Sequence, residues 1–184
     1  GLPLPNASFA SGYFARVAPE KGVRELLAAW RGQDGPSGSL AIVGDGELMP
    51  EVRAAASADP RVTVTGLIPR ALVLERMGSA RAVVLPSQWD EPFGLAPLEA
   101  MACGTMVVVS DRGILPEFVA PVGRDAVFAS GDPASLAGRL SSWLGDGALR
   151  EAAAERLAAH TRRTYAFERC GDGYLDAFRS VLSS

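Results

Sequence analysis

The chain has 184 residues, which is enough for one well-buried domain. Its formal net charge of −3 excludes the strongly basic surface typical of nucleic-acid-binding domains, so we expect no nucleic-acid partner. Hydrophobic residues make up 48% and charged residues 21%, as in ordinary globular domains, and no apolar run approaches the roughly 20 residues that span a bilayer.

Short apolar runs alternate with amphipathic stretches along the whole chain. The apolar runs predict strands and the amphipathic stretches predict helices. Strands are expected at 11–17, 39–44, 61–66, 82–87, 106–110 and 125–130. Helices are expected at 19–30, 47–57, 69–80, 94–103, 115–119, 132–145, 148–163 and 167–182. Asp132, which stands before a proline, is the expected N-cap of its helix.

The composition of the strands predicts how they pair. Runs of Val, Ile and Leu without alternation are typical of parallel sheets that are covered on both faces. Right-handed crossovers through the helices then give an α/β fold with a doubly wound parallel sheet, which is Rossmann-like. We divide the chain into a linker or interdomain segment at 1–10, a Rossmann-like domain at 11–145, and C-terminal helices at 146–184 that pack on it. The opening Gly-Leu-Pro-Leu-Pro has no initiating Met, which favours a piece of a longer protein.

The cysteines and the single histidine indicate neither a metal site nor a redox site. Cys103 and Cys170 fall in different predicted helices, and the chain has no CxxC or Cys/His pattern. We therefore expect reduced thiols and a cytoplasmic location. His160 lies in a polar helical stretch, so we expect it on the surface rather than in acid/base chemistry.

Loops at the carboxyl ends of the strands are the expected ligand site, because doubly wound sheets bind ligands there. In the first of these loops, four residues separate Arg16 from Lys21. Lys21 is the single lysine of the chain, which has seventeen arginines. A cation in the first turn of a helix opposes the helix dipole at a cost of up to about 1 kcal/mol. Lys21 is therefore either a tolerated surface residue or, as we favour, half of a phosphate clamp with the forked guanidinium of Arg16.

Two carboxylates flank the turn between the strand at 82–87 and the following helix. Glu91 precedes the helix, Glu99 lies within it, and Gly94 and Leu95 open it with backbone N–H groups that are free to bind phosphate. Carboxylates on both sides of an anion site suit a ligand with hydroxyls on both sides of its phosphates, as in a nucleotide-sugar. Alternatively, Glu91 only complements the helix dipole and Glu99 only faces solvent.

Three further loops contribute candidates with weaker signals. Gly66 and Leu67 begin a Gly-Leu-Ile-Pro segment that is suited to line a base pocket with backbone groups and apolar side chains. Asp45, between two glycines, is better explained as a turn or N-cap residue than as a ligand. Trp89 is either a sugar platform or a packing residue, and the sequence does not favour one of them.

These motifs resemble a known family. The string PSQWDEPFGLAPLEAMACGTMVVVS, with ARVAPEKG upstream and LPE downstream, is similar to the C-terminal, donor-binding half of retaining GT-B glycosyltransferases of family four, the glycosyl transferases group 1. The resemblance covers about residues 10–180. It implies one half of a GT-B fold, a nucleoside-diphosphate sugar as donor, and neither a bound metal nor another cofactor. It also implies a bacterial-type enzyme whose N-terminal domain holds the acceptor, so that membrane association comes only through that domain and the isolated chain is inactive.

The resemblance also implies roles for individual residues. Arg16 and Lys21 would bind the donor diphosphate, Glu91 the donor sugar and Glu99 the ribose. Arg16, Lys21 and Glu91 form the implied catalytic set. The implied nucleotide-binding set adds these residues: Gly66, Leu67, Phe93, Gly94, Leu95 and Glu99.

The sequence departs from the family after Gly113, where Ile114 replaces a frequent second glycine. Three other interpretations stay open. The chain is alternatively a non-catalytic or regulatory nucleotide-sugar-binding module, or a GT-B-type sugar-nucleotide epimerase. A generic dinucleotide-binding protein is disfavoured, because the first loop lacks G-x-G-x-x-G.

Overall fold

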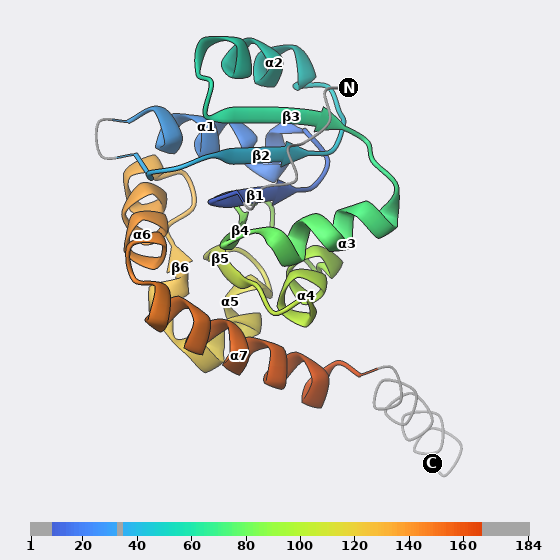
Figure 1. Ribbon diagram of the computed structural model, residues 1–184, viewed down its shortest axis with the longest axis vertical. Helices are drawn as coiled ribbons and strands as arrows, with labels where there is room; N and C mark the ends of the chain where they lie inside the picture. Colours follow the sequence, from blue (N-terminus) through green and yellow to red (C-terminus); the bar gives the residue numbers. More distant parts are fainter. Residues whose placement is uncertain (1–8, 33–34, 167–184) are drawn as a thin grey trace.

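The computed structural model describes residues 9–32 and 35–166. Within them lies a six-stranded sheet in the order β3-β2-β1-β4-β5-β6, and every neighbouring pair of strands is parallel (Figure 1). This order defines the doubly wound, Rossmann-like fold and confirms the predicted fold class. The strands are β1 (Ser11–Phe14), β2 (Leu40–Val43), β3 (Val62–Gly66), β4 (Ala82–Leu85), β5 (Met106–Ser110) and β6 (Val127–Phe128).

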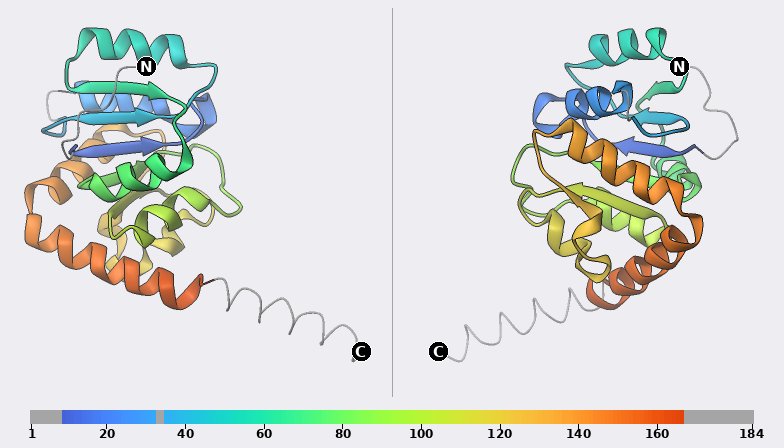
Figure 2. Two further views of the ribbon diagram at one scale, coloured as in Figure 1. Left: turned by 45° about the vertical axis from the view of Figure 1, so that its right-hand side comes forward. Right: turned by 90° about the vertical axis from the view of Figure 1, so that its left-hand side faces the viewer.

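Helices cover both faces of the sheet. The α-helices are α1 (Val23–Arg31), α2 (Met49–Ala58), α3 (Arg70–Ser79), α4 (Leu95–Ala102), α5 (Leu115–Phe118), α6 (Pro133–Gly145) and α7 (Gly147–Thr164). The 3-10 turns are η1 (Pro19–Lys21), η2 (Ala120–Val122) and η3 (Arg124–Ala126). α1 packs on α6 at one face, and α3 packs on α4 at the other (Figure 2, right). α2 lies beside the edge strand β3, and α7 runs along the opposite end of the molecule, against α4 and β5.

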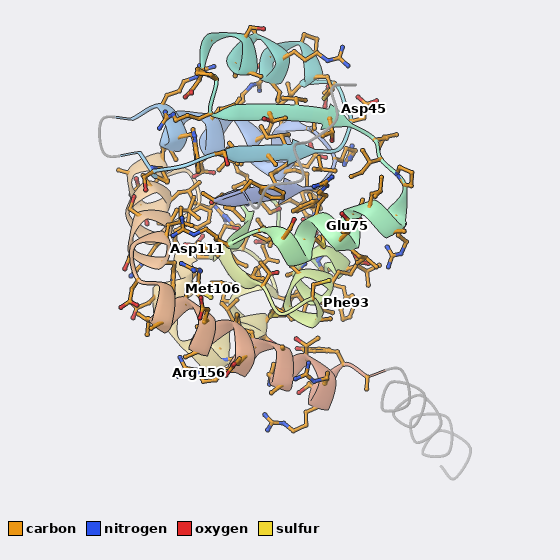
Figure 3. All side chains as sticks on the ribbon, viewed as in Figure 1. Asp45, Glu75, Phe93, Met106, Asp111 and Arg156 are labelled. Carbon is orange, nitrogen blue, oxygen red and sulfur yellow. The ribbon has the colours of Figure 1, made fainter. Side chains whose placement is uncertain are left out.

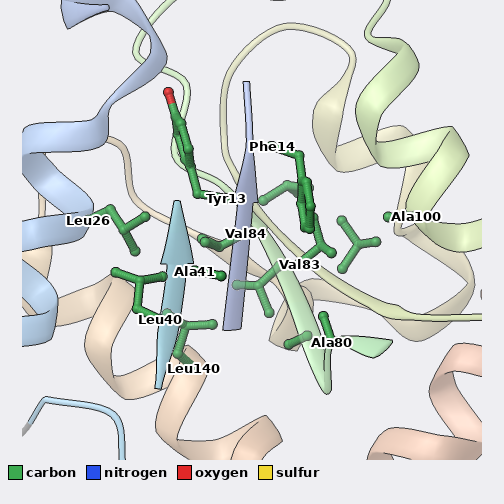
Figure 4. Close-up of a cluster of buried hydrophobic side chains, with 14 of the residues drawn as sticks. Tyr13, Phe14, Leu26, Leu40, Ala41, Ala80, Val83, Val84, Ala100 and Leu140 are labelled. Carbon is green, nitrogen blue, oxygen red and sulfur yellow. The ribbon is translucent and has the colours of Figure 1, made fainter. Parts of the chain in front are cut away.

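The central strand β1 shows why the core has two halves. Tyr13 and Phe14 are consecutive, so their side chains point to opposite faces of the sheet. Figure 4 shows Tyr13 on the side of Leu26 in α1 and Phe14 on the side of Ala100 in α4. Both aromatic residues are buried, as are the valines of β4 and β5, so the sheet is apolar on both faces.

The segment after β1 differs from its prediction, and the difference concerns the site. The strand ends at Phe14 rather than at residue 17. Lys21 does not lie in the first turn of the long helix but ends the separate turn η1, because Gly22 adopts φ 69° and interrupts the helix. The expected opposition between Lys21 and the dipole of α1 is therefore wrong.

Differences at the end of the domain are smaller. The strand expected at 125–130 is reduced to Val127–Phe128 by the preceding turn η3. The N-cap prediction for Asp132 is confirmed, since its carboxylate accepts hydrogen bonds of 3.0 Å from the backbone N–H groups of Ala134 and Ser135. His160, expected on the surface, is half-buried and packs edge-to-face on Tyr165, with ring centroids 5.9 Å apart. The helix expected at 167–182 lies outside the described residues.

The packed domain begins before residue 11, where the sequence had placed its start. Phe9 and Ala10, which we assigned to the linker at 1–10, are buried in the core. Their carbonyls accept hydrogen bonds of 3.1 Å from the backbone of Arg81 and Ala82, so the packed domain already includes them. Over residues 9–32 and 35–166, no helix is long and apolar enough to cross a membrane.

Candidate functional site

The loops that follow β1 and β4 meet at the centre of the sheet, where the strand order reverses. Gly22 lies so close to the second loop that a Cβ atom on it would be 1.7 Å from the carbonyl oxygen of Pro86. The N–H of Gln88 donates a 2.9 Å hydrogen bond to the carbonyl of Glu20. The two loops are therefore joined backbone to backbone at the position where doubly wound sheets bind ligands.

This contact brings together two of the predicted residues. Lys21 Nζ forms an ion pair with Glu91 Oε1, and the two side chains are 24% and 15% exposed. The hydroxyl of Ser87, which the sequence analysis did not select, donates to the same carboxylate oxygen over 3.0 Å. The carboxylate of Glu91 is thus oriented by a cation from one loop and a hydroxyl from its own loop.

The backbone of Glu91 is held from the other side by the loop after β5. The N–H of Ile114 donates to the carbonyl of Glu91 over 3.1 Å, and Gly113 N–H donates to Asp90 Oδ1 over 3.2 Å. Gly113 has φ 53°, and a Cβ atom on it would be 2.4 Å from the carbonyl oxygen of Glu91. Only glycine fits this contact, so the chain needs Gly113 here even though it lacks a second glycine at Ile114.

Glu91 lines a cavity of about 320 Å³, which we call the Glu91 cavity. The N-terminus of α4 opens into it, since Gly94, Leu95 and Ala96 are among its walls. Within the described part of the chain, no side chain caps this end of α4. Its backbone N–H groups, together with the adjacent Lys21, make this cavity suitable for an anion.

Glu99 lines a second cavity of about 420 Å³, which we call the Glu99 cavity. Its apolar walls include Ile68, Val73 and Met77. The two cavities share the following wall residues: Phe14, Ala15, Arg16 and Ala96. The two predicted carboxylates therefore face separate but adjoining cavities, with Arg16 in the wall between them.

The position of Arg16 depends on a buried tyrosine. The Tyr13 hydroxyl donates a 2.7 Å hydrogen bond to the carbonyl of Arg16. Burial, with the nearby carboxylate of Glu20, raises the pKa of Tyr13, so the hydroxyl stays protonated and able to donate. The guanidinium of Arg16 is largely exposed and pairs with Glu20, four residues along the chain. The role of Tyr13 is not visible in the sequence, because an apolar strand pattern does not reveal a hydroxyl bonded beyond the strand.

The remaining candidates occupy different places. Leu67 is 79% exposed and lines the Glu99 cavity, and Leu95 lines the Glu91 cavity. Gly66 lies outside both walls, and its carbonyl accepts a 3.0 Å hydrogen bond from Gly44 N–H. Phe93 packs edge-to-face on Phe118, with ring centroids 6.0 Å apart, and is not part of either wall.

The structure gives no sign of a ligand-binding role for two weaker candidates, Asp45 and Trp89, beyond the place of Asp45 in a cavity wall. Asp45 accepts a 2.8 Å hydrogen bond from the N–H of Gly46, as expected for a turn residue, although it also lines the Glu99 cavity. In Figure 3 Asp45 and Phe93 lie on the right-hand side of the molecule, whereas Arg156 lies on α7 at the lower left. Trp89 is exposed and lies outside the walls of both cavities.

A buried acid lies behind the loop that carries Glu91. Glu25 of α1 accepts a 3.1 Å hydrogen bond from Gln88 Nε2. Burial raises the pKa of Glu25 above its usual value. In the described ranges, no three His, Cys, Asp or Glu side chains converge in a way that could hold a metal ion.

The arrangement of loops and cavities can be compared with known proteins. The pattern of the family described as "Glycosyl transferases group 1" matches residues 3–160. The chain belongs to this family. It is 37% identical over 142 residues to the 2-deoxystreptamine N-acetyl-D-glucosaminyltransferase of Streptomyces fradiae, a match that covers 73% of this chain and 34% of that protein.

Solved structures of glycosyltransferases have the same fold. Sucrose-phosphate synthase from Thermosynechococcus elongatus superposes with a TM-score of 0.84 at 26% identity, over 98% of this chain and 47% of that one. HepE of Anabaena, in complex with UDP and glucose, superposes with a TM-score of 0.81 at 23% identity, over 94% of this chain and 48% of that one. These neighbours are GT-B enzymes, and this chain spans less than half of the length of each relative named here.

Proposed function

We propose that this chain is the donor-binding half of a retaining glycosyltransferase and binds a nucleoside-diphosphate sugar across its two cavities. One observation carries the proposal: Glu91 and Glu99 line adjoining cavities that share a wall containing Arg16 and, from the first turn of α4, Ala96. A nucleotide-sugar has hydroxyl groups at both ends and a diphosphate between them. Carboxylates suit the hydroxyls, and cations and helix N–H groups suit the diphosphate.

Each group of the donor then has a partner. The sugar enters the Glu91 cavity, where Glu91 accepts hydrogen bonds from its hydroxyls, and the nucleoside enters the Glu99 cavity, where Glu99 accepts from the ribose. Leu67 and Ile68 offer apolar contact to the base. Arg16, Lys21 and the N–H groups at Gly94 and Leu95 bind the diphosphate. Donor binding redirects Lys21 from Glu91 to phosphate, which frees Glu91 for the sugar.

The same groups support the chemical step. When the sugar leaves the nucleotide, negative charge grows on the departing diphosphate. Once the donor is bound, Arg16, Lys21 and the N-terminus of α4 lie beside the departing diphosphate and stabilise this charge. We propose that they do so without a metal ion, since Arg16, Lys21 and the N-terminus of α4 all line the Glu91 cavity.

The acceptor belongs to a part of the protein that this chain does not contain. The chain spans 34% of the Streptomyces transferase and 47% of sucrose-phosphate synthase. This proportion supports an N-terminal domain that faces the Glu91 cavity and holds the acceptor. The isolated chain would then bind donor without transferring sugar, and its cytoplasmic location stays a prediction.

Calorimetric titration with UDP, GDP, ADP and dTDP and their sugars tests donor binding. UDP is the first candidate, because HepE was solved with UDP and glucose. Glu91→Gln should weaken the nucleotide-sugar more than the free nucleotide, and Glu99→Gln should weaken both. Glu51→Gln, which alters an exposed acid on α2, is the matched control. Absence of binding at millimolar concentration overturns the proposal.

A transfer assay tests the incomplete site. The chain alone should show no turnover, and addition of the N-terminal half should restore it. Efficient transfer by the chain alone contradicts the claim that the acceptor site lies elsewhere.

A further inference from the structure

A second ion pair lies beside the Glu99 cavity. Arg70 Nη2 donates to Glu99 Oε1 over 2.6 Å, and the pair joins the first residue of α3 to the middle of α4. The arginine is 72% exposed, whereas the carboxylate is 18% exposed. The sequence analysis did not select Arg70, and none of the roles proposed above uses it.

The direction from which Arg70 approaches matters. Glu99 is part of the cavity wall, and Arg70 is not. The guanidinium therefore bonds to a residue of the cavity wall without being part of that wall itself. Arg70 can remain in place while the side of Glu99 that faces the cavity accepts hydrogen bonds, so it is not a latch that the ligand must displace.

The pair restricts the conformation of Glu99. A glutamate on a helix has several accessible rotamers, and its carboxylate rotates freely unless it is bonded. Charge-assisted hydrogen bonds to a guanidinium are short and directional, so Arg70 fixes the orientation of the carboxylate before any ligand arrives. A pair of neighbouring hydroxyls is bound best by two acceptor oxygens in a fixed plane.

We propose that Arg70 is a positioning residue that makes Glu99 selective for the intact diol of a ribose. The inference rests on the proposed function, because it assumes that a nucleoside occupies the Glu99 cavity. Arg70 does not touch the ligand. It acts through Glu99, and its removal lowers the preference for ribose over deoxyribose rather than the affinity for phosphate.

The test compares ribonucleoside diphosphates with their 2′-deoxy and 3′-deoxy forms by calorimetry. The probe is whichever of UDP, GDP and ADP binds the wild-type chain. We expect the wild type to prefer the ribose form by about tenfold, the factor that corresponds to roughly 1.4 kcal/mol. Arg70→Ala should reduce this ratio to about threefold or less, and Arg70→Lys should restore part of it, because the charge remains and the fork is lost.

Two controls separate positioning from general electrostatics. Arg24→Ala removes another Arg–Glu pair between two helices, Arg24–Glu51, which is not part of the Glu99 cavity wall, and should leave the ratio unchanged. In a Glu99→Gln background, Arg70→Ala should have no further effect on the ratio. Thermal unfolding verifies that each variant is folded.

The outcomes distinguish this inference from the proposed function. If Arg70→Ala keeps the wild-type ratio, or weakens ribose and deoxyribose forms equally, the positioning role is overturned and donor binding stands. If the wild type binds both forms equally, the role of the Glu99 carboxylate as a diol acceptor is overturned as well. If no nucleotide binds, the proposed function and this inference both fail.

Discussion

Arginines line hollows at opposite edges of the sheet, and the groups that they bind differ between the two edges. The hollow at the amino edge is about 770 Å³ and lies between α7 and the starts of β4 and β5. Arg81 donates to the carbonyl of Leu144, and Arg150 donates to the carbonyl of Trp143 over 3.4 Å. Both carbonyls belong to the last turn of α6, so these two cations complete the end of a helix.

The cations at the carboxyl edge have side-chain partners instead. Lys21 pairs with Glu91, Arg16 with Glu20 and Arg70 with Glu99. A carboxylate can accept a ligand hydroxyl beside its cation or in place of it, whereas a carbonyl at the end of a helix loses its partner when the cation leaves. The arginines of the larger hollow thus stabilise the fold. The kind of group that a cation binds indicates a ligand site better than the volume of the hollow does.

Loss of a cation at the carboxyl edge should weaken ligand binding, whereas loss of a cation at the amino edge should lower stability. Lys21→Ala should weaken nucleoside diphosphate binding between about 10- and 100-fold, because it removes a charge-assisted hydrogen bond worth roughly 1.5–3 kcal/mol. Arg81→Ala should leave that affinity within about twofold and lower the free energy of unfolding by about 1–2 kcal/mol, since it uncaps α6. Calorimetry and urea unfolding measure the two quantities.

The contrast fails if Arg81→Ala weakens nucleotide binding as strongly as Lys21→Ala does. The nucleoside without its phosphates supplies an internal control. Lys21→Ala and Arg16→Ala should each leave nucleoside binding nearly unchanged.

Two glycines sharpen the comparison at the level of the backbone. Gly113 at the carboxyl edge and Gly104 at the amino edge both have positive φ, of 53° and 77°. A Cβ atom on Gly113 would meet the backbone of Glu91, whereas one on Gly104 would meet nothing within 4 Å. Both alanine variants should lose about 1 kcal/mol of stability from backbone strain, and Gly113→Ala should lose more because its Cβ meets the backbone of Glu91. Only Gly113→Ala should weaken nucleotide-sugar binding, by roughly tenfold if Glu91 shifts by even a fraction of an ångström. Equal affinities for the two variants would contradict this positioning of Glu91.

The sequence predicted the sheet well, because its strands depend on local patterns. Continuous valines at β4 and β5 and the Asp132 cap need no information from distant residues. The predictions that were wrong depend on tertiary contacts. Lys21 leaves the helix because Gly22 packs on Pro86, and His160 is half-buried because Tyr165 packs on it.

The site was predicted in part for the same reason. Glu91, Glu99 and the opening of α4 follow from one strand–turn–helix segment. The pair Arg70–Glu99 and the bond from Tyr13 to Arg16 require knowledge of which helices and loops are neighbours, which one sequence does not contain. The ligand-binding roles of these residues stay predictions.

Two buried hydroxyls allow a smaller test of the same contrast. Ser87 at the carboxyl edge donates to Glu91, and Thr105 at the amino edge donates to the carbonyl of Met77 over 2.7 Å. Ser87→Ala should weaken nucleotide-sugar binding about threefold to tenfold, since a typical hydrogen bond contributes about 1 kcal/mol. Thr105→Val should affect the free energy of unfolding alone. If Ser87→Ala changes only stability, the hydroxyl does not orient Glu91.

The smallest expected effect is a pH dependence of stability at the carboxyl edge. Because burial raises the pKa of Glu25 above its usual 4.5, its ionisation destabilises the fold as the pH rises from 4.5 through the folded pKa. Glu25→Gln removes this cost, so the stability of the variant relative to the wild type should increase with pH over that window. Urea unfolding between pH 4 and pH 7 measures it.

Glu51 supplies a control of opposite sign. The hydrogen bond from Arg24 lowers the pKa of Glu51, so its contribution to stability is lost as the pH falls through the folded pKa. Glu51→Gln should therefore be less stable than the wild type at neutral pH, with the difference vanishing on acidification. A Glu25→Gln variant that follows the same trend as Glu51→Gln would contradict the burial effect at Glu25.

The wall that separates the two cavities has a consequence for ligand length. Phe14, Ala15, Arg16 and Ala96 line both the cavity that contains Glu91 and the cavity that contains Glu99. Under the proposed function, a donor must be long enough to cross this wall and reach an acid on each side. A sugar joined to a nucleoside through a single phosphate is shorter, so we expect it to contact the two acids less well. The wall would then favour donors with two phosphates over donors with one, whatever their base and sugar.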